Sequence, residues 1–317
     1  MLHRRARARA AEILLTAAAM WPIRSFLFVP AHRRDWVGKA VRQAPGAVVL
    51  DIEDSVPIEE RPRARTLLAE EIAELRGAGV GAVVRINPFS GETEAEIAAA
   101  TAEGLTALML PKATTAAEVQ AVHDLLSYQE GRAGLPRGSV AILPLPETAQ
   151  GLHDAHLLAR ASARVKGIVG VISGPVAADV ARAFGFRASL AGTEQLYMNS
   201  KLVLDSRAAG APYPIAGVFG VPIDDLAATE GLIRRARDLG YSGVCVMHPS
   251  HVALANAVFR PTPEEVAYCS GLLAAFDDAE RRGLGAVTYR GAMVDYAMLP
   301  LARELVEEAR RLGMAGG

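Results

Sequence analysis

Residues 47–54 read AVVLDIED, an apolar run that ends in three carboxylic acids. The first residues of this stretch predict a buried β-strand, and Asp51, Glu53 and Asp54 stand where that strand ends. Moving a carboxylate out of water is unfavourable unless another group pairs with it or coordinates it. The stretch therefore predicts a buried strand whose carboxyl end lies at a polar site.

Seven more apolar runs occur after residue 22, and stretches with helical spacing separate them. This alternation predicts repeated βα units on a parallel sheet, and the continuous apolar runs favour strands that are buried on both faces. Eight such strands close a (β/α)8 TIM barrel, the α/β fold that we predict. The predicted strands are 25–30, 47–54, 81–87, 107–112, 140–147, 167–173, 213–218 and 243–249.

Helical spacing is clearest in four of the stretches between the strands. These predicted helices are 59–76, 115–129, 194–209 and 224–239. A doubly wound open sheet is the structural alternative to the barrel. No GxGxxG motif follows the first strand, so a dinucleotide-binding fold has little support.

The composition is typical of a globular chain with a large core. Hydrophobic residues make up 51% of the 317 residues and charged residues 22%, which argues against disorder. The 34 basic and 35 acidic residues nearly cancel, with no long block of one sign outside the first ten residues. A nucleic-acid partner is therefore not predicted.

The cysteine pattern argues against a disulfide scaffold and against a zinc site. Cys245 and Cys269 are the only cysteines, and they lack CxxC spacing. We expect both to be small buried side chains of a protein in a reducing compartment. This predicts a cytoplasmic location.

Three segments are predicted along the chain. Residues 1–21 are Arg-rich with a short apolar run, too short to span a bilayer and interrupted by Glu12, unlike a transit peptide. We expect them to be a disordered leader with Met20 as the natural start, and we expect no membrane partner. Residues 22–259 are predicted to form the barrel, and residues 260–317 a helical extension that begins at Thr262.

The active site of a barrel lies at the carboxyl ends of its strands. Polar side chains that follow the predicted strands are Asp51, Glu53, Asp54, Arg85, Asn87, Lys112, Glu147 and His248. Lys112 could instead form rim ion pairs with Glu53 or Asp54, and His248 is more readily a hydrogen-bonded structural residue. Arg85 and Glu147 follow almost wholly apolar strands, where an unpaired charge would be strongly unfavourable.

A magnesium ion would account for Glu147. Mg²⁺ accepts a few carboxylates together with waters and substrate oxygens, so two well-placed acids suffice. Asp179, just beyond the sixth predicted strand, is the best candidate for the second acid. From these residues alone we predict a barrel with a divalent-cation site.

Several sequence blocks, in order along residues 23–313, carry a family resemblance. They are RSFLFVPA (24–31), VVLDIEDSVP (48–57), ARTLL (64–68), VVRINP (83–88), LMLPK (108–112), PLPETAQGL (144–152), VMHPS (246–250) and GAVTYRGAMVDYAMLPLAREL (285–305). Together they resemble the citrate lyase beta-like and malyl-CoA (citramalyl-CoA) lyase family of metal-dependent acyl-CoA lyases and aldolases. The resemblance implies a (β/α)8 barrel with a C-terminal helical lid, assembled as homotrimers or hexamers.

The resemblance also implies cofactors and site residues. It implies Mg²⁺, with Mn²⁺ as an alternative ion, and coenzyme A as part of the substrate. Glu147 and Asp179 would be the metal ligands, although residues 174–185 read GPVAADVARAFG, with Ala178 where the family has glutamate. The expected substrate- or cofactor-binding residues are Arg24, Arg85, Asn87 and Lys112.

The expected catalytic residues are Arg85, Asp295, Glu53 and Asp54. Arg85 would contact the thioester carbonyl, and Asp295, in the GAMVD block, would reach the active site of a neighbouring subunit to transfer a proton. Glu53 or Asp54 would hold Arg85, Lys112 or water in place. The predicted reaction is cleavage or formation of a 3-hydroxyacyl-CoA thioester such as malyl-CoA or citramalyl-CoA. The alternatives are a pyruvate-type class II aldolase acting on a free hydroxy-keto acid, and a non-catalytic barrel homologue.

Overall fold

The computed structural model describes residues 9–15, 19–176 and 178–314. The chain divides into two compact units, residues 1–257 and 258–317. The boundary lies two residues before the one predicted from the sequence, between residues 259 and 260. Each unit is described by itself.

The first unit is a parallel (β/α)8 barrel, as predicted. Its strands are β1 (Ser25–Pro30), β2 (Ala47–Asp51), β3 (Gly81–Arg85), β4 (Leu105–Pro111), β5 (Ala141–Leu145), β6 (Val169–Ser173), β7 (Ile215–Phe219) and β8 (Gly243–Val246). They lie in the order β5-β4-β3-β2-β1-β8-β7-β6, so that β1 pairs with both β2 and β8. All eight predicted strands are present. Several strands were predicted to end later than they do, because the polar residues that follow them lie beyond the last residue that pairs with a neighbouring strand.

The strands are buried because both of their faces are covered. Every residue of β2, β4, β5 and β6 is buried, and the largest fully buried side chains include Phe26, Leu50, Ile86, Leu108 and Met109. Burial of apolar surface is the main favourable term in folding. It explains why apolar runs without polar alternation form the strands of this barrel.

The barrel is nearly closed, with a seam between β5 and β6. In the described part of the chain a single bridge joins Ile142 of β5 to Val165, in the segment before β6: the Ile142 amide donates to Arg164 O (2.9 Å), and Ile142 O accepts from the Lys166 amide (3.3 Å). The buried Arg164 guanidinium also forms a double hydrogen bond with Glu130, at 2.8 and 2.7 Å. This ion pair links the helix before β5 to the segment before β6.

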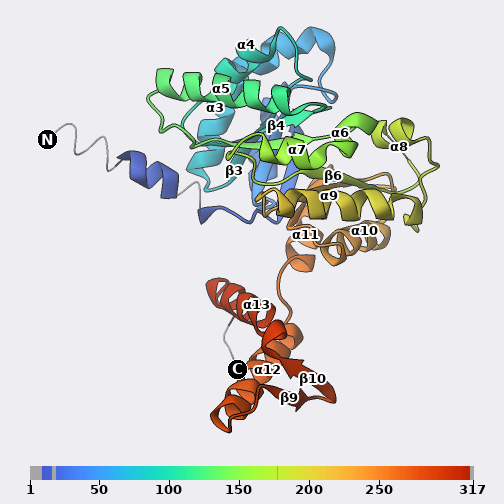
Figure 1. Ribbon diagram of the computed structural model, residues 1–317. Helices are drawn as coiled ribbons and strands as arrows, with labels where there is room; N and C mark the ends of the chain where they lie inside the picture. Colours follow the sequence, from blue (N-terminus) through green and yellow to red (C-terminus); the bar gives the residue numbers. More distant parts are fainter. Residues whose placement is uncertain (1–8, 16–18, 177, 315–317) are drawn as a thin grey trace, which may run out of the picture. The chain divides into compact units, whose positions relative to one another are not determined.

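Helices surround the barrel, and the four that were predicted most clearly are confirmed. They are α3 (Arg61–Gly77), α5 (Ala116–Arg132), α9 (Leu196–Ala208) and α10 (Leu226–Asp238). The other helical elements of this unit are α2 (Arg34–Val41), η1 (Ile58–Glu60), α4 (Thr93–Ala100), α6 (Ala149–His153), α7 (Ala155–Arg160), α8 (Asp179–Phe184), η2 (Thr193–Gln195), η3 (Pro249–His251) and α11 (Val252–Val258), which crosses the unit boundary. In Figure 1, α3, α4 and α5 lie side by side outside β3 and β4.

The segment before the barrel is partly described. Residues 9–15 are helical, and Arg9 forms an ion pair of 2.6 Å with Glu103. Residues 1–8 and 16–18 lie outside the described residues, so the disordered leader remains a prediction. Among the described helices, none combines the length and the apolarity needed to cross a bilayer.

The second unit is a helical pair with a β-hairpin. It contains α12 (Pro263–Arg281), β9 (Ala286–Tyr289), β10 (Ala292–Asp295), η4 (Tyr296–Met298) and α13 (Leu299–Arg311). The predicted start of α12 is confirmed, because Thr262 caps it in a capping box with Glu265. The hairpin was not predicted. It turns through Arg290 and Gly291, which both have positive φ (49° and 84°), as a tight two-residue turn requires.

Candidate active site

The carboxyl ends of β2 and β3 are joined by a double hydrogen bond. Asp51 and Arg85 are register partners, and Arg85 donates from Nε to Oδ1 and from Nη2 to Oδ2, both at 2.7 Å. The Ser55 amide and hydroxyl also donate to Asp51 Oδ2. Burial opposes ionisation of Asp51, but the hydrogen bonds and charge of Arg85 outweigh it and lower the pKa of Asp51. Arg85 is thus held as a charged group with a fixed orientation.

Glu53 bridges two cations at this end of the barrel. Its Oε2 lies 3.1 Å from Arg85 Nη1, and its Oε1 accepts a hydrogen bond of 2.7 Å from Lys112 Nζ. The side chain is 1% exposed. Burial raises the pKa of Glu53, and the charges of Arg85 and Lys112 compensate only in part. Glu53 therefore links the residue after β4 to the residue at the end of β3.

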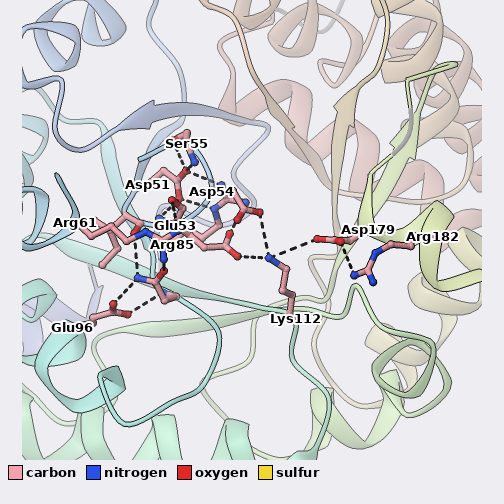
Figure 2. A network of polar contacts seen from close by, with 12 residues as sticks. Asp51, Glu53, Asp54, Ser55, Arg61, Arg85, Glu96, Lys112, Asp179 and Arg182 are labelled. Carbon is pink, nitrogen blue, oxygen red and sulfur yellow. Dashed lines mark hydrogen bonds and ion pairs between the residues drawn. The ribbon is translucent and has the colours of Figure 1, made fainter. Parts of the chain in front are cut away.

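Lys112 is the centre of a group of acids. Its Nζ lies 2.7 Å from Glu53, 3.3 Å from Asp54 and 3.6 Å from Asp179, and Figure 2 shows Asp179 on the side opposite the other two acids. Partial burial opposes the charge of the ammonium group, but the hydrogen bond with Glu53 and the nearby carboxylates outweigh it and raise the pKa of Lys112. The rim ion pairs considered from the sequence are therefore present. Lys112 also has a positive φ of 51°, which is uncommon outside glycine.

Glu147 lies just beyond β5 and has a carboxylate oxygen without a partner. Its Oε2 is buried and forms no hydrogen bond. Burial, followed by the charge of Glu53, raises the pKa of Glu147 to about 7, with a further contribution from Asp179. Arg85 and Lys112 oppose this rise. Glu147 and Asp179 therefore lie within the same electrostatic neighbourhood, although they follow different strands.

The donor set at this end of the barrel suits a hard divalent cation. Burying a carboxylate oxygen is unfavourable unless it coordinates a cation or accepts a hydrogen bond. Within the described ranges, no group of three or more His, Cys, Asp or Glu residues has the arrangement of a complete metal cage. Mg²⁺ does not need one, because it retains waters and binds substrate oxygens. Glu147 with Asp179 therefore fits a magnesium ion better than a metal such as zinc, which needs a closed set of ligands.

Asn87 follows β3, and its side-chain oxygen and nitrogen both form hydrogen bonds with other protein groups. Its Oδ1 accepts from Arg61 Nη1 (2.6 Å), and its Nδ2 donates to Ile52 O (3.1 Å) and to Glu96 Oε1 (2.6 Å). Its amide donates to Glu96 Oε2 at 2.9 Å. The structure thus uses Asn87 inside the protein, where the sequence predicted a contact with substrate or cofactor. Arg61 and Glu96 were not predicted to take part. Arg61 lies in a helix that was predicted without a role at the site, and the apolar pattern around Glu96 was not recognised as a helix.

Of the two other predicted site residues, Arg24 does not join this group, and Asp295 lies in the other compact unit of the chain. Arg24 precedes β1 and so lies at the amino-terminal end of the barrel, with a strand of six residues, about 20 Å, separating it from the carboxyl end. Asp295 belongs to the second unit, where it ends β10 and accepts a hydrogen bond of 2.9 Å from the Ala297 amide.

The remaining candidates have structural surroundings. His248 Nδ1 lies 2.7 Å from Ser250 Oγ, which agrees with a hydrogen-bonded structural histidine. Cys245 is buried, and burial raises the pKa of its thiol to about 12, so it is not a reactive thiolate. Cys269 is only partly buried.

Comparison with known proteins gives consistent matches. The family model described as HpcH/HpaI aldolase/citrate lyase matches residues 24–249. The citrate lyase subunit beta-like protein of Deinococcus radiodurans is 33% identical over 289 residues, covering 90% of this chain and 96% of that protein. The L-malyl-CoA/beta-methylmalyl-CoA lyase of Cereibacter sphaeroides is 31% identical over 316 residues, covering 92% and 96%.

A solved structure extends these matches to three dimensions. The structure of the protein CitE from Mycobacterium tuberculosis in complex with magnesium, acetoacetate and coenzyme A has a TM-score of 0.70 and 26% sequence identity. The match covers 92% of this chain and 99% of that chain. The resemblance inferred from the sequence blocks is confirmed at this level: the chain belongs to the HpcH/HpaI aldolase/citrate lyase family.

Proposed function

We propose that this chain is a magnesium-dependent carbon–carbon lyase that acts on a 3-hydroxyacyl-CoA thioester such as malyl-CoA or citramalyl-CoA. Cleavage would release a shorter acyl-CoA and a keto acid, and condensation would be the reverse reaction. The observation that carries the proposal is the buried Glu147 Oε2, which has no hydrogen-bond partner and lies in the electrostatic neighbourhood of Arg85, Lys112 and Asp179 at the carboxyl ends of the strands. The names of the matched proteins, a malyl-CoA lyase and a CitE complex with magnesium and coenzyme A, support the same reading.

Glu147 and Asp179 would hold the divalent ion, Mg²⁺ or alternatively Mn²⁺. The chemistry that such an ion supplies is a lowered pKa of the substrate hydroxyl and polarisation of the keto group. Lys112 and Glu53 would keep the surrounding charges balanced, because Lys112 contacts Asp179 and Glu53 at once.

Arg85 would stabilise the negative charge that develops on the thioester oxygen when the carbon–carbon bond breaks. Its two hydrogen bonds to Asp51 and its contact with Glu53 fix the guanidinium plane and engage three of its five N–H groups, so the others can donate to the substrate. A donor that is already oriented before the reaction needs no reorganisation in the transition state, and such electrostatic stabilisation is commonly the largest catalytic contribution. Asp51 and Glu53 would act by keeping Arg85 in place.

Asp295 would protonate the enolate carbon during cleavage, or remove its proton during condensation. We propose that it does so in the active site of a neighbouring subunit, in a cytoplasmic homotrimer or hexamer. Closure of the second unit over the substrate would exclude water from the enolate.

The function is tested by incubating the protein and Mg²⁺ with a panel of 3-hydroxyacyl-CoA esters while glyoxylate and pyruvate are assayed. We expect cleavage of at least one ester, and loss of that activity in Glu147→Gln with the circular dichroism spectrum unchanged. Glu92→Gln, an exposed glutamate outside the site, is the matched control and should retain full activity. Cleavage of free hydroxy-keto acids with no cleavage of any ester would favour the aldolase instead.

A further inference from the structure

The short segment between β2 and η1 holds Glu53, and two backbone carbonyls of this segment are fixed by side chains from elsewhere. Ile52 O accepts from Asn87 Nδ2 at 3.1 Å, and Glu53 O accepts from Arg61 Nη2 at 3.2 Å. These carbonyls lie on the two sides of Glu53 along the chain. The backbone from which the Glu53 side chain projects is therefore held at two points.

Asn87 can adopt only one orientation of its side-chain amide. Its oxygen faces the Arg61 guanidinium at 2.6 Å, and its nitrogen faces the Glu96 carboxylate at 2.6 Å. Rotation of the amide by half a turn would direct the nitrogen at a cation and the oxygen at an anion. Hydrogen bonds to charged groups are roughly twice as strong as neutral ones. The two opposite charges thus select the orientation that directs Nδ2 to Ile52 O.

Glu96 is the buried end of this arrangement. It is 3% exposed, and both of its oxygens accept from Asn87, one from the amide and one from Nδ2. Figure 2 shows Arg61 and Glu96 on one side of Glu53, and Lys112 and Asp179 on the other. Neither Arg61 nor Glu96 therefore needs to contact a substrate in order to affect Glu53.

We propose that Arg61, Asn87 and Glu96 form a positioning clamp, which holds Glu53 between Arg85 and Lys112 and thereby sets the rate of the chemical step. The kinetic part of this proposal rests on the proposed function. A carboxylate that drifts by about 1 Å can cost on the order of 100-fold in rate, because the groups that it orients lose their alignment. The charge on the thioester oxygen develops in the transition state, so kcat should fall more than KM rises.

A purely structural link between α3 and α4 is the alternative, and the chain contains a control for it. Arg65 and Glu92 also connect α3 with the residue that precedes α4, through an ion pair of 2.8 Å. Their hydrogen bond joins the two side chains at an exposed position. In the part of the chain that the structure describes, this ion pair joins Arg65 and Glu92 to each other and does not involve residues 52–56.

The test compares Arg61→Gln and Glu96→Gln with Arg65→Gln and Glu92→Gln. Backbone amides of residues 52–56 are measured by hydrogen exchange, which does not depend on any reaction. We expect faster exchange in the two clamp variants, and kcat lower by roughly 10–100-fold with little change in KM. Arg61→Lys should recover part of kcat, since an ammonium group can still donate to one of the two acceptors.

Equal exchange and equal kcat in clamp and control variants would overturn the proposal. If Arg61→Gln does not fold, Glu96→Gln and Arg61→Lys carry the comparison. If the wild-type protein cleaves no thioester while the clamp variants still exchange faster, the positioning of Glu53 is supported and the proposed function is the part that fails.

Discussion

Arg85 and Asp51 end adjacent strands and face each other through two hydrogen bonds of 2.7 Å, although 34 residues separate them in the sequence. Neither charge could be buried alone at this position. The pair explains how an acid at the end of an apolar strand is tolerated, and it places the one guanidinium that the proposed reaction needs.

Removing the charge of Asp51 should destabilise the protein and lower its activity together. In Asp51→Asn the buried Arg85 guanidinium loses its double hydrogen bond and keeps only the contact with Glu53, so we expect a loss of about 3 kcal/mol in the free energy of unfolding. Urea denaturation measures it. Asp35→Asn, which breaks an exposed pair with Lys39, is the control and should leave stability almost unchanged. A change in Asp51→Asn no larger than in this control would contradict the role given to the pair of Asp51 and Arg85.

Glu71 should make the protein less stable as the pH rises. It is fully buried on α3 without a hydrogen-bond partner for either oxygen, and burial raises its pKa from 4.5 to about 8. Between these pH values the folded state retains a proton that the unfolded state has lost, so stability falls as the pH rises and levels off above about 8. Melting temperatures of the wild type and of Glu71→Gln are measured from pH 4 to about pH 9, a range that includes both pKa values. The two proteins should have similar melting temperatures at the acidic end, where Glu71 is protonated in both the folded and the unfolded state.

The variant should lose the downward slope of stability with pH in that window. Glu94→Gln, an exposed glutamate on α4, is the control and should keep the wild-type slope. An unchanged slope in Glu71→Gln would mean that this carboxyl group is not the source of the pH dependence.

The ion pair at the barrel seam should be important for stability but not for chemistry. Burial disfavours the charge of Glu130, but the hydrogen bonds of Arg164 outweigh it and lower the pKa of Glu130. Glu130→Gln leaves Arg164 without its anion, and we expect a loss of about 3–5 kcal/mol measured by urea denaturation. At a temperature where the variant is still folded, kcat per folded molecule should match the wild type. Asp124→Asn, at an exposed position of α5, serves as the control.

Asp295 should control proton transfer and leave metal binding intact. We expect Asp295→Asn to lower kcat for thioester cleavage by roughly 10²–10⁴-fold, the usual contribution of a general acid or base. Its affinity for Mn²⁺, followed by electron paramagnetic resonance, should equal that of the wild type. Asp278→Asn, an exposed aspartate of the same unit, is the control. A wild-type rate in Asp295→Asn would favour the aldolase reading over the lyase.

Much of the barrel was predictable because its strands are local apolar runs. Residues 105–111, for example, are buried on both faces, so an unbroken run of mostly apolar residues in the sequence is enough to predict the strand. The helices α3, α5, α9 and α10 were predictable for the same reason, through their own spacing. The short helix α4 and the hairpin of β9 and β10 were missed. Glu96 interrupts the apolar face of α4, and the Arg290 position of the turn does not carry the residue type that usually marks it.

The sequence by itself determined the eight strands, the family and the presence of acids and bases at the strand ends. Only the tertiary structure decided which charges pair. Lys112 meets Glu53 across 59 residues, and the amide of Asn87 is enclosed by Arg61 and Glu96 instead of facing the barrel mouth. Arg24 lies at the other end of its strand. The physical reason is that burial patterns depend on neighbours along the chain, whereas a charge is stabilised by partners a few ångströms away on other strands.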